Sequence, residues 1–170
     1  LKNIIKEKIM IMDGAMGTML QSHKLSEADF RGNRFVNHEH NLKGNNDILS
    51  LTQPAIIQNI HESYLLAGAN IIETNTFNAK AISQSDYKLE DYVYELNFIS
   101  AQIAKKSITK TNQFVAGALG PTNQTASLSP DVNDPGFRKI SFDELKVAYF
   151  EQAKGLFAGG VDLFLTETVF

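Results

Sequence analysis

Residues 70–74 read Asn-Ile-Ile-Glu-Thr, and a polar stretch, Asn-Thr-Phe-Asn, follows directly at residues 75–78. A short apolar run that ends in polar residues is typical of a buried strand in a parallel sheet. Three runs of the same kind lie at residues 8–12, 113–117 and 161–165, with helical patterns between them. The sequence therefore predicts a repeating β-loop-α unit and an α/β fold.

Three helices are predicted between the runs. The first begins at Pro54, which suits the first turn of a helix, and ends at Gly68. The second begins at about Leu89 and carries its apolar residues on one side. The third begins with a capping box at residues 141–144, Ser-Phe-Asp-Glu, and ends at Gly160.

Composition excludes several classes of protein. The 170 residues are 43% apolar and 21% charged, with a net charge of −3 and no basic run. Neither nucleic acid nor an anionic membrane is therefore an expected partner. No apolar stretch reaches the roughly 18 residues of a membrane-spanning helix, and residues 1–8 lack the apolar centre of a signal peptide, so we expect a cytoplasmic protein. The absence of cysteine excludes disulfides, thiolate nucleophiles and sulfur-ligated metals from these residues.

Two carboxylates at the predicted strand ends are the main functional signal. Asp13 follows the first run and Glu167 the last, and all strand ends of a parallel sheet open on the same side. Two acids there would attract an ammonium group, while the backbone N–H groups of Gly14 and Ala15 can approach a carboxylate closely. This pattern favours an α-amino-acid site. The alternative is that Asp-Gly is an ordinary turn and the acid at position 167 a helix cap or a solvated group.

Two segments, at residues 30–50 and 121–139, are longer than usual connections in such folds. Long loops after strands are usually functional, so we expect both to flank one cleft. His61 lies on or beside the apolar face of the first helix and is interpreted as a packed or capping histidine rather than a catalyst.

The strand-end motifs together resemble the homocysteine S-methyltransferase family. They are Asp13-Gly14-Ala15-Met16-Gly17-Thr18, Glu73-Thr74-Asn75-Thr76-Phe77-Asn78, Gly120-Pro121-Thr122-Asn123 and Thr166-Glu167-Thr168. Within that family, residues 42–47 and 127–135 are similar to the N-terminal modules of cobalamin-dependent methionine synthases. The resemblance extends from about Ile9 to Phe170.

The resemblance implies a (β/α)₈ TIM barrel that binds homocysteine at its C-terminal face. It also implies methyl transfer from methylcobalamin, carried by a cobalamin-binding module, to homocysteine activated by zinc on three cysteines, with a folate-binding module regenerating the cofactor. By the same resemblance, Asp13 and Glu167 would hold the substrate ammonium, and the backbone of Gly14 and Ala15 its carboxylate. Asn75 and Thr76 would shape the floor of the pocket.

A whole barrel takes about 250 residues. Residues 1–170 are therefore expected to be a partial homocysteine-binding domain, the first half of the barrel with about four βα units, truncated after the fourth strand. The family's zinc cysteines lie in later strands, so we expect substrate contacts in this chain but no catalytic residue and no metal ligand. We also expect the chain alone to be inactive, and half barrels to self-associate.

Two other functions stay open. One is a non-catalytic amino-acid-binding or interaction module that uses the same acidic site. The other is a betaine- or methylmethionine-dependent homocysteine S-methyltransferase, which should lack the match at residues 127–135.

Overall fold

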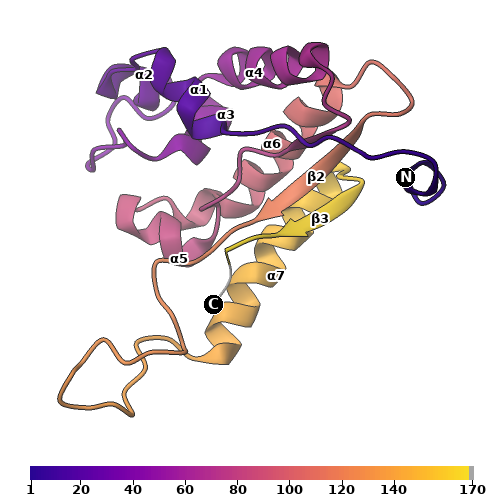
Figure 1. The fold of residues 1–170 in the computed structure, drawn as a ribbon. Helices are drawn as coiled ribbons and strands as arrows, with labels where there is room; N and C mark the ends of the chain where they lie inside the picture. The colour runs from indigo at the N-terminus through magenta and orange to yellow at the C-terminus, as the bar shows by residue number, and fades with distance from the viewer. Residues whose placement is uncertain (169–170) are drawn as a thin grey trace.

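The computed structural model describes residues 1–168 and contains a three-stranded parallel sheet (Figure 1). Its strands are β1 (Ile71–Glu73), β2 (Phe114–Leu119) and β3 (Leu163–Thr166), in the order β1-β2-β3. Ile72 lies beside Val115 in the register. Three of the predicted runs are confirmed as strands, and their parallel arrangement brings their carboxyl ends to one edge of the sheet.

Three long helices support this sheet. Helix α4 (Pro54–Ala67) precedes β1, α6 (Val93–Ser107) connects β1 to β2, and α7 (Phe142–Gly159) connects β2 to β3. In Figure 1, α6 and α7 lie together behind the strands. They approach closely because α7 presents glycine to α6: a Cβ atom at Gly159 would lie only 2.7 Å from the carbonyl oxygen of Phe98.

The ends of these helices follow the local sequence. Gly68 ends α4 with a φ of 113°, in the left-handed region that glycine adopts readily. At the start of α7, the Ser141 hydroxyl accepts from the Glu144 N–H at 3.2 Å, and the Glu144 carboxylate accepts from the Ser141 N–H at 2.8 Å. The predicted end of α4 at Gly68 and the predicted start of α7 at the capping box are confirmed. Helix α6 begins at Val93, after a short 3₁₀ turn, rather than at Leu89.

Short elements fill the connections. They are the helices α1 (Met16–Ser22), α2 (Glu27–Arg31), α3 (Leu49–Thr52) and α5 (Ala81–Gln84), and the 3₁₀ turns η1 (Ile4–Lys6), η2 (Asn46–Ile48), η3 (Ser85–Tyr87) and η4 (Glu90–Tyr92). The core beneath the sheet holds Ile72 and Val115 against Leu65, Ala69 and Ala104. Because both strand residues are fully buried, the strand ends that follow them have fixed positions.

The prediction of a strand over the whole of residues 8–12 is wrong. Only Met12 pairs with the sheet, through a single parallel bridge to Ile71, although the carbonyl of Ile11 also accepts from the N–H groups of Asn70 and Ile71. Ile9 is 90% exposed and Ile11 60% exposed. This segment lies at the edge of the sheet with a strand on one side only, so its apolar side chains gain little from pairing.

The architecture is that of about half of a TIM-barrel-type protein, as predicted, with three regular strands and one bridging segment. Phe170, where we expected the barrel to break off, lies outside the described residues. Among residues 1–168, no helix has the length and apolar character needed to cross a bilayer.

Candidate functional site

A cavity of about 380 Å³ lies at the carboxyl ends of the strands. All six side chains or backbone positions predicted from the sequence line it: Asp13, Gly14, Ala15, Asn75, Thr76 and Glu167. The structure therefore brings together residues from both ends of the chain. Asp47 and Glu73, which the sequence analysis did not select, also line this cavity.

Asp13 is held against β1 by its neighbours. Its backbone N–H donates to the carbonyl of Ile71 at 2.9 Å, and both of its carboxylate oxygens accept from the N–H of Glu73 at 3.1 Å. The pKa of Asp13 is raised to about 7, chiefly by burial and to a smaller extent by the negative charge of Glu73, while the hydrogen bond from the Glu73 N–H opposes the shift. A cation bound beside this carboxyl would favour its ionised form.

Glu73 is one of two cavity acids that sequence reasoning did not select, the other being Asp47. Glu73 ends β1, and its pKa is raised by burial and then by the charge of Glu167. Glu73 thus interacts electrostatically with both Asp13 and Glu167. Glu73 could have been found from the sequence, because it is the last residue of the predicted parallel strand. The last residue of such a strand lies at the same edge of the sheet as the residues that follow the neighbouring strands. Four acids line the cavity where two were predicted: Asp13, Asp47, Glu73 and Glu167.

The backbone at Gly14 and Ala15 is open to a ligand. Both residues are exposed, and among the hydrogen bonds of residues 1–168 none uses their N–H groups as donors. A Cβ atom at position 14 would meet only the Tyr64 hydroxyl, at 3.9 Å. Two backbone donors therefore stand at the cavity close in sequence to the Asp13 carboxylate.

Asn75 and Thr76 line the cavity, and both are buried. The Asn75 amide donates to the carbonyl of Asn46 at 2.8 Å and to the Ser50 hydroxyl at 3.3 Å. The Thr76 hydroxyl donates to the carbonyl of Ala118 at 2.9 Å. These bonds fix the loop after β1 to the first long segment and to β2.

The first long segment contributes directly to the cavity through Asn46 and Asp47. Asp47 is buried, and its carboxylate accepts from the N–H of Asn78 at 3.0 Å. Burial raises its pKa to about 6, while this hydrogen bond and the charge of Lys80 oppose the shift. Asp47 therefore joins the first long segment to the loop after β1.

The second long segment differs from the prediction. None of residues 121–139 lines the cavity, and residues 131–139 are all exposed. Figure 1 shows this segment projecting from the body between β2 and α7. The prediction that this segment flanks the same cleft as the first long segment is therefore wrong for the described residues.

His61 lies apart from the cavity. It is fully buried in α4, and neither ring nitrogen has a hydrogen-bond partner among residues 1–168. The interpretation as a packed histidine is confirmed, and the capping alternative is not, since a cap would need such a bond. Burial lowers the pKa of His61 to about 4, so the ring is neutral near pH 7.

The model of the homocysteine S-methyltransferase family matches residues 10–170. The chain belongs to this family. The family match and the fold agree with the strand-end motifs.

Solved structures agree in fold. The homocysteine methyltransferase MmuM from Escherichia coli, in its metallated form, is 22% identical, with a TM-score of 0.72 over 99% of this chain and 57% of that chain. Its oxidized form is 20% identical, with a TM-score of 0.69 over 96% of this chain and 55% of that chain. The chain spans about half the length of these structures.

For a member of the homocysteine S-methyltransferase family, zinc is the metal to test. Zinc that activates a substrate thiol is held by three protein ligands, usually thiolate, imidazole or carboxylate, and leaves its fourth position to the substrate. The chain has no cysteine, and no group of three or more His, Asp or Glu within residues 1–168 could hold a metal ion. Residues 1–168 therefore do not fit zinc.

Proposed function

We propose that the cavity binds the amino-acid end of homocysteine for methyl transfer to its sulfur. Asp13 and Glu167 hold the ammonium group, with Glu73 adding negative charge, and the N–H groups of Gly14 and Ala15 receive the carboxylate. The observation that carries the proposal is that acids from both ends of the chain line one cavity beside two unused backbone donors. Asn75 and Thr76 support the floor.

The electrostatics favour this ligand over a simple carboxylic acid or a phosphate. Carboxyl groups repel one another at this cavity: the charge of Glu73 helps to raise the pKa of Asp13, and the charge of Glu167 helps to raise that of Glu73. An ammonium group relieves the repulsion, whereas an anion alone would increase it. The backbone donors next to Asp13 make a zwitterion the best match for the whole site.

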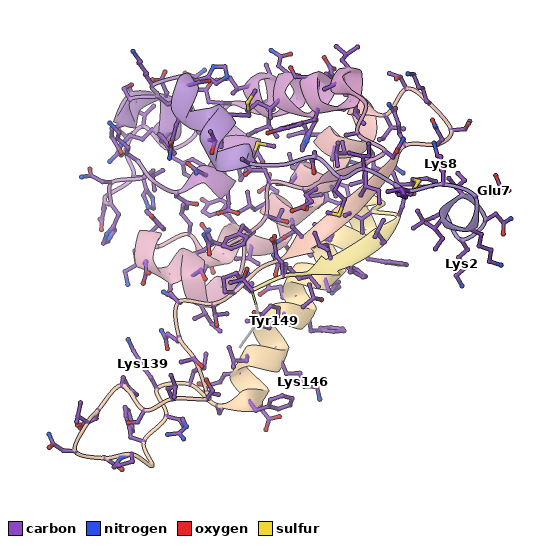
Figure 2. The ribbon with its side chains drawn as sticks, in the orientation of Figure 1. Lys2, Glu7, Lys8, Lys139, Lys146 and Tyr149 are labelled. Atoms are coloured by element: carbon purple, nitrogen blue, oxygen red, sulfur yellow. The ribbon has the colours of Figure 1, made fainter. Side chains whose placement is uncertain are left out.

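Calorimetric titration of L-homocysteine into the chain tests this assignment. We expect binding by the wild type and binding weakened about tenfold or more by Asp13→Asn and by Glu167→Gln, because each removes a charge at the ammonium. Glu7→Gln is the matched control, because Glu7 lies in the N-terminal turn that stands away from the body in Figure 2. Equal heats for all four proteins would remove the ammonium assignment.

We propose further that the methyl donor is methylcobalamin, as in the N-terminal modules that residues 42–47 and 127–135 resemble. The zinc ligands and the cobalamin- and folate-binding modules would then lie outside these 170 residues. Homocysteine would lose its thiol proton, and its sulfur would then bond to the methyl carbon as the bond from that carbon to the donor breaks, with the electron pair of the broken bond staying on the donor.

A donor panel separates this proposal from its alternatives. The full-length protein should turn over homocysteine with methylcobalamin and not with betaine or S-methylmethionine. Turnover with either of the latter would assign the donor differently. Homocysteine binding without turnover by any donor would favour the non-catalytic module.

A further inference from the structure

Lys80 is a fully buried charged side chain next to the cavity. It lies at the residue before α5, and its exposed fraction is 0%. No carboxylate among residues 1–168 lies within 4.0 Å of its ammonium nitrogen. Because burying an ammonium group without an ion pair is costly, its contacts must provide a compensating interaction.

Those contacts join three parts of the fold. The Lys80 ammonium donates to the carbonyl of Phe77 at 2.8 Å and lies 5.3 Å from the ring centre of Tyr149, as in a cation–π pair. The Tyr149 hydroxyl donates to the carbonyl of Gly120 at 2.8 Å. Tyr149, labelled in Figure 2, lies on α7. The loop after β1, the loop after β2 and α7 are thus linked through one ammonium group.

Gly120 contacts Phe77 directly. A side chain at this position would overlap the carbonyl oxygen of Phe77 and would lie 2.8 Å from the Cδ2 atom of its ring. Phe77 therefore packs directly on the Gly120 backbone, and its carbonyl is held there by Lys80. Phe77 also lines the cavity and remains 40% exposed, so this residue is accessible to a ligand there.

We propose that Lys80 is a positioning residue of this cavity: its ammonium holds the Phe77 carbonyl against Gly120 and so keeps the Phe77 ring in place beside the ligand. Loss of the proton from Lys80 weakens this hold, because a neutral amine donates a weaker hydrogen bond to the Phe77 carbonyl and loses the cation–π attraction to Tyr149. The effect on ligand affinity rests on the function proposed above, whereas the effect on Phe77 does not.

The charges around Lys80 set the pH at which the hold is released. Burial lowers the pKa of Lys80 to about 8, and the negative charges of Asp47 and Glu167 oppose the shift. Tyr149, the remaining titratable group in contact, has its pKa raised by burial and stays neutral in this range. Lys80 is therefore the group expected to titrate near pH 8.

A tryptophan at position 77 reports on this hold without any ligand, since the 170-residue chain has no tryptophan. In Phe77→Trp we expect the emission to change with a midpoint near pH 8 as the side chain is released. Adding Lys80→Met should give the released emission at every pH between 7 and 9.5. Adding Lys80→Arg should keep the held emission throughout, because arginine does not lose its proton in this range.

An identical transition near pH 8 in the Lys80→Met background would overturn the proposal. Where Lys80→Met does not fold, Tyr149→Phe decides, because it removes the bond to Gly120 and leaves the ring and Lys80. We then expect emission shifted toward the released form at pH 7, and unchanged emission would count against the linkage.

Homocysteine affinity supplies the second readout. At pH 7 we expect Lys80→Met to bind about tenfold more weakly than the wild type and Lys80→Arg to recover most of this loss. Lys146→Met, an exposed lysine of α7 labelled in Figure 2, is the control and should bind as the wild type does. Wild-type affinity in Lys80→Met would overturn the role in binding. If the wild type itself fails to bind, the proposed function fails, and the tryptophan titration still tests the positioning.

Discussion

Homocysteine affinity should fall about fivefold when the pH is lowered from 8 to 6: protonation of Asp13, which must be ionised to hold the ammonium group, accounts for about tenfold, and partial loss of the Lys80 proton lowers the affinity at pH 8 about twofold. The pKa of Asp13 is raised to about 7 in the empty cavity. At pH 8 the carboxyl is mostly ionised, whereas at pH 6 about nine molecules in ten carry a proton that binding must remove. Binding at pH 7 should accordingly release about half a proton.

Calorimetry measures both quantities. The dissociation constant is determined at pH 6, 7 and 8, and the proton release comes from titrations at pH 7 in two buffers of different ionisation enthalpy. Asp13→Asn is the control: it should bind more weakly at every pH and lose most of the pH dependence. Affinity that does not change between pH 6 and 8, or the same pH dependence in Asp13→Asn, would refute the reasoning.

Three further predictions concern the chain as a whole. Burial lowers the pKa of His61 from 6.5 to about 4 in the folded protein. As the pH falls from about 6.5 to 4, the unfolded state therefore takes up a proton that the folded state does not, and stability falls over this range. Between pH 7 and pH 4, the free energy of unfolding measured in urea should fall by about 3 kcal/mol more in the wild type than in His61→Leu. The same pH dependence of this free energy in both proteins would contradict the prediction. The 170-residue chain alone should show no methyl transfer with homocysteine and methylcobalamin, a prediction that turnover in a product assay would disprove. The chain should also self-associate through the exposed α7 side chains Val147, Phe150 and Phe157. Light scattering should show a mass above that of one chain, reduced by Phe150→Ser with Phe157→Ser, and a monomer mass for the wild type at micromolar concentration would exclude this.

Local sequence signals predicted the long helices well. The ends of α4 and α7 depend on Gly68 and on the Ser141–Glu144 pair, whose effects act within one turn of the chain. The strands around Ile72 and Val115 were recognisable because both faces of a parallel sheet are usually covered, which leaves a continuous apolar run. The run at residues 8–12 has the same composition but lies at an edge, and composition alone does not distinguish the two situations.

The cavity was predictable in outline because parallel strands open on one side. That rule brought Asp13 and Glu167 to the same edge across most of the chain. It did not identify Asp47 or Lys80, since their burial depends on how the segment before α3 packs against the loop after β1. Such contacts between distant segments leave no local pattern in the sequence.

The most direct measurement of the central claim follows the backbone amides of Gly14 and Ala15 by NMR while L-homocysteine is added. The account predicts that these two amides shift among the most in the chain. It also predicts that 3-mercaptopropylamine, which has the amine and thiol but no carboxylate, leaves them nearly unchanged. Equal shifts with both compounds, or homocysteine shifts confined to residues outside the cavity, would contradict the account.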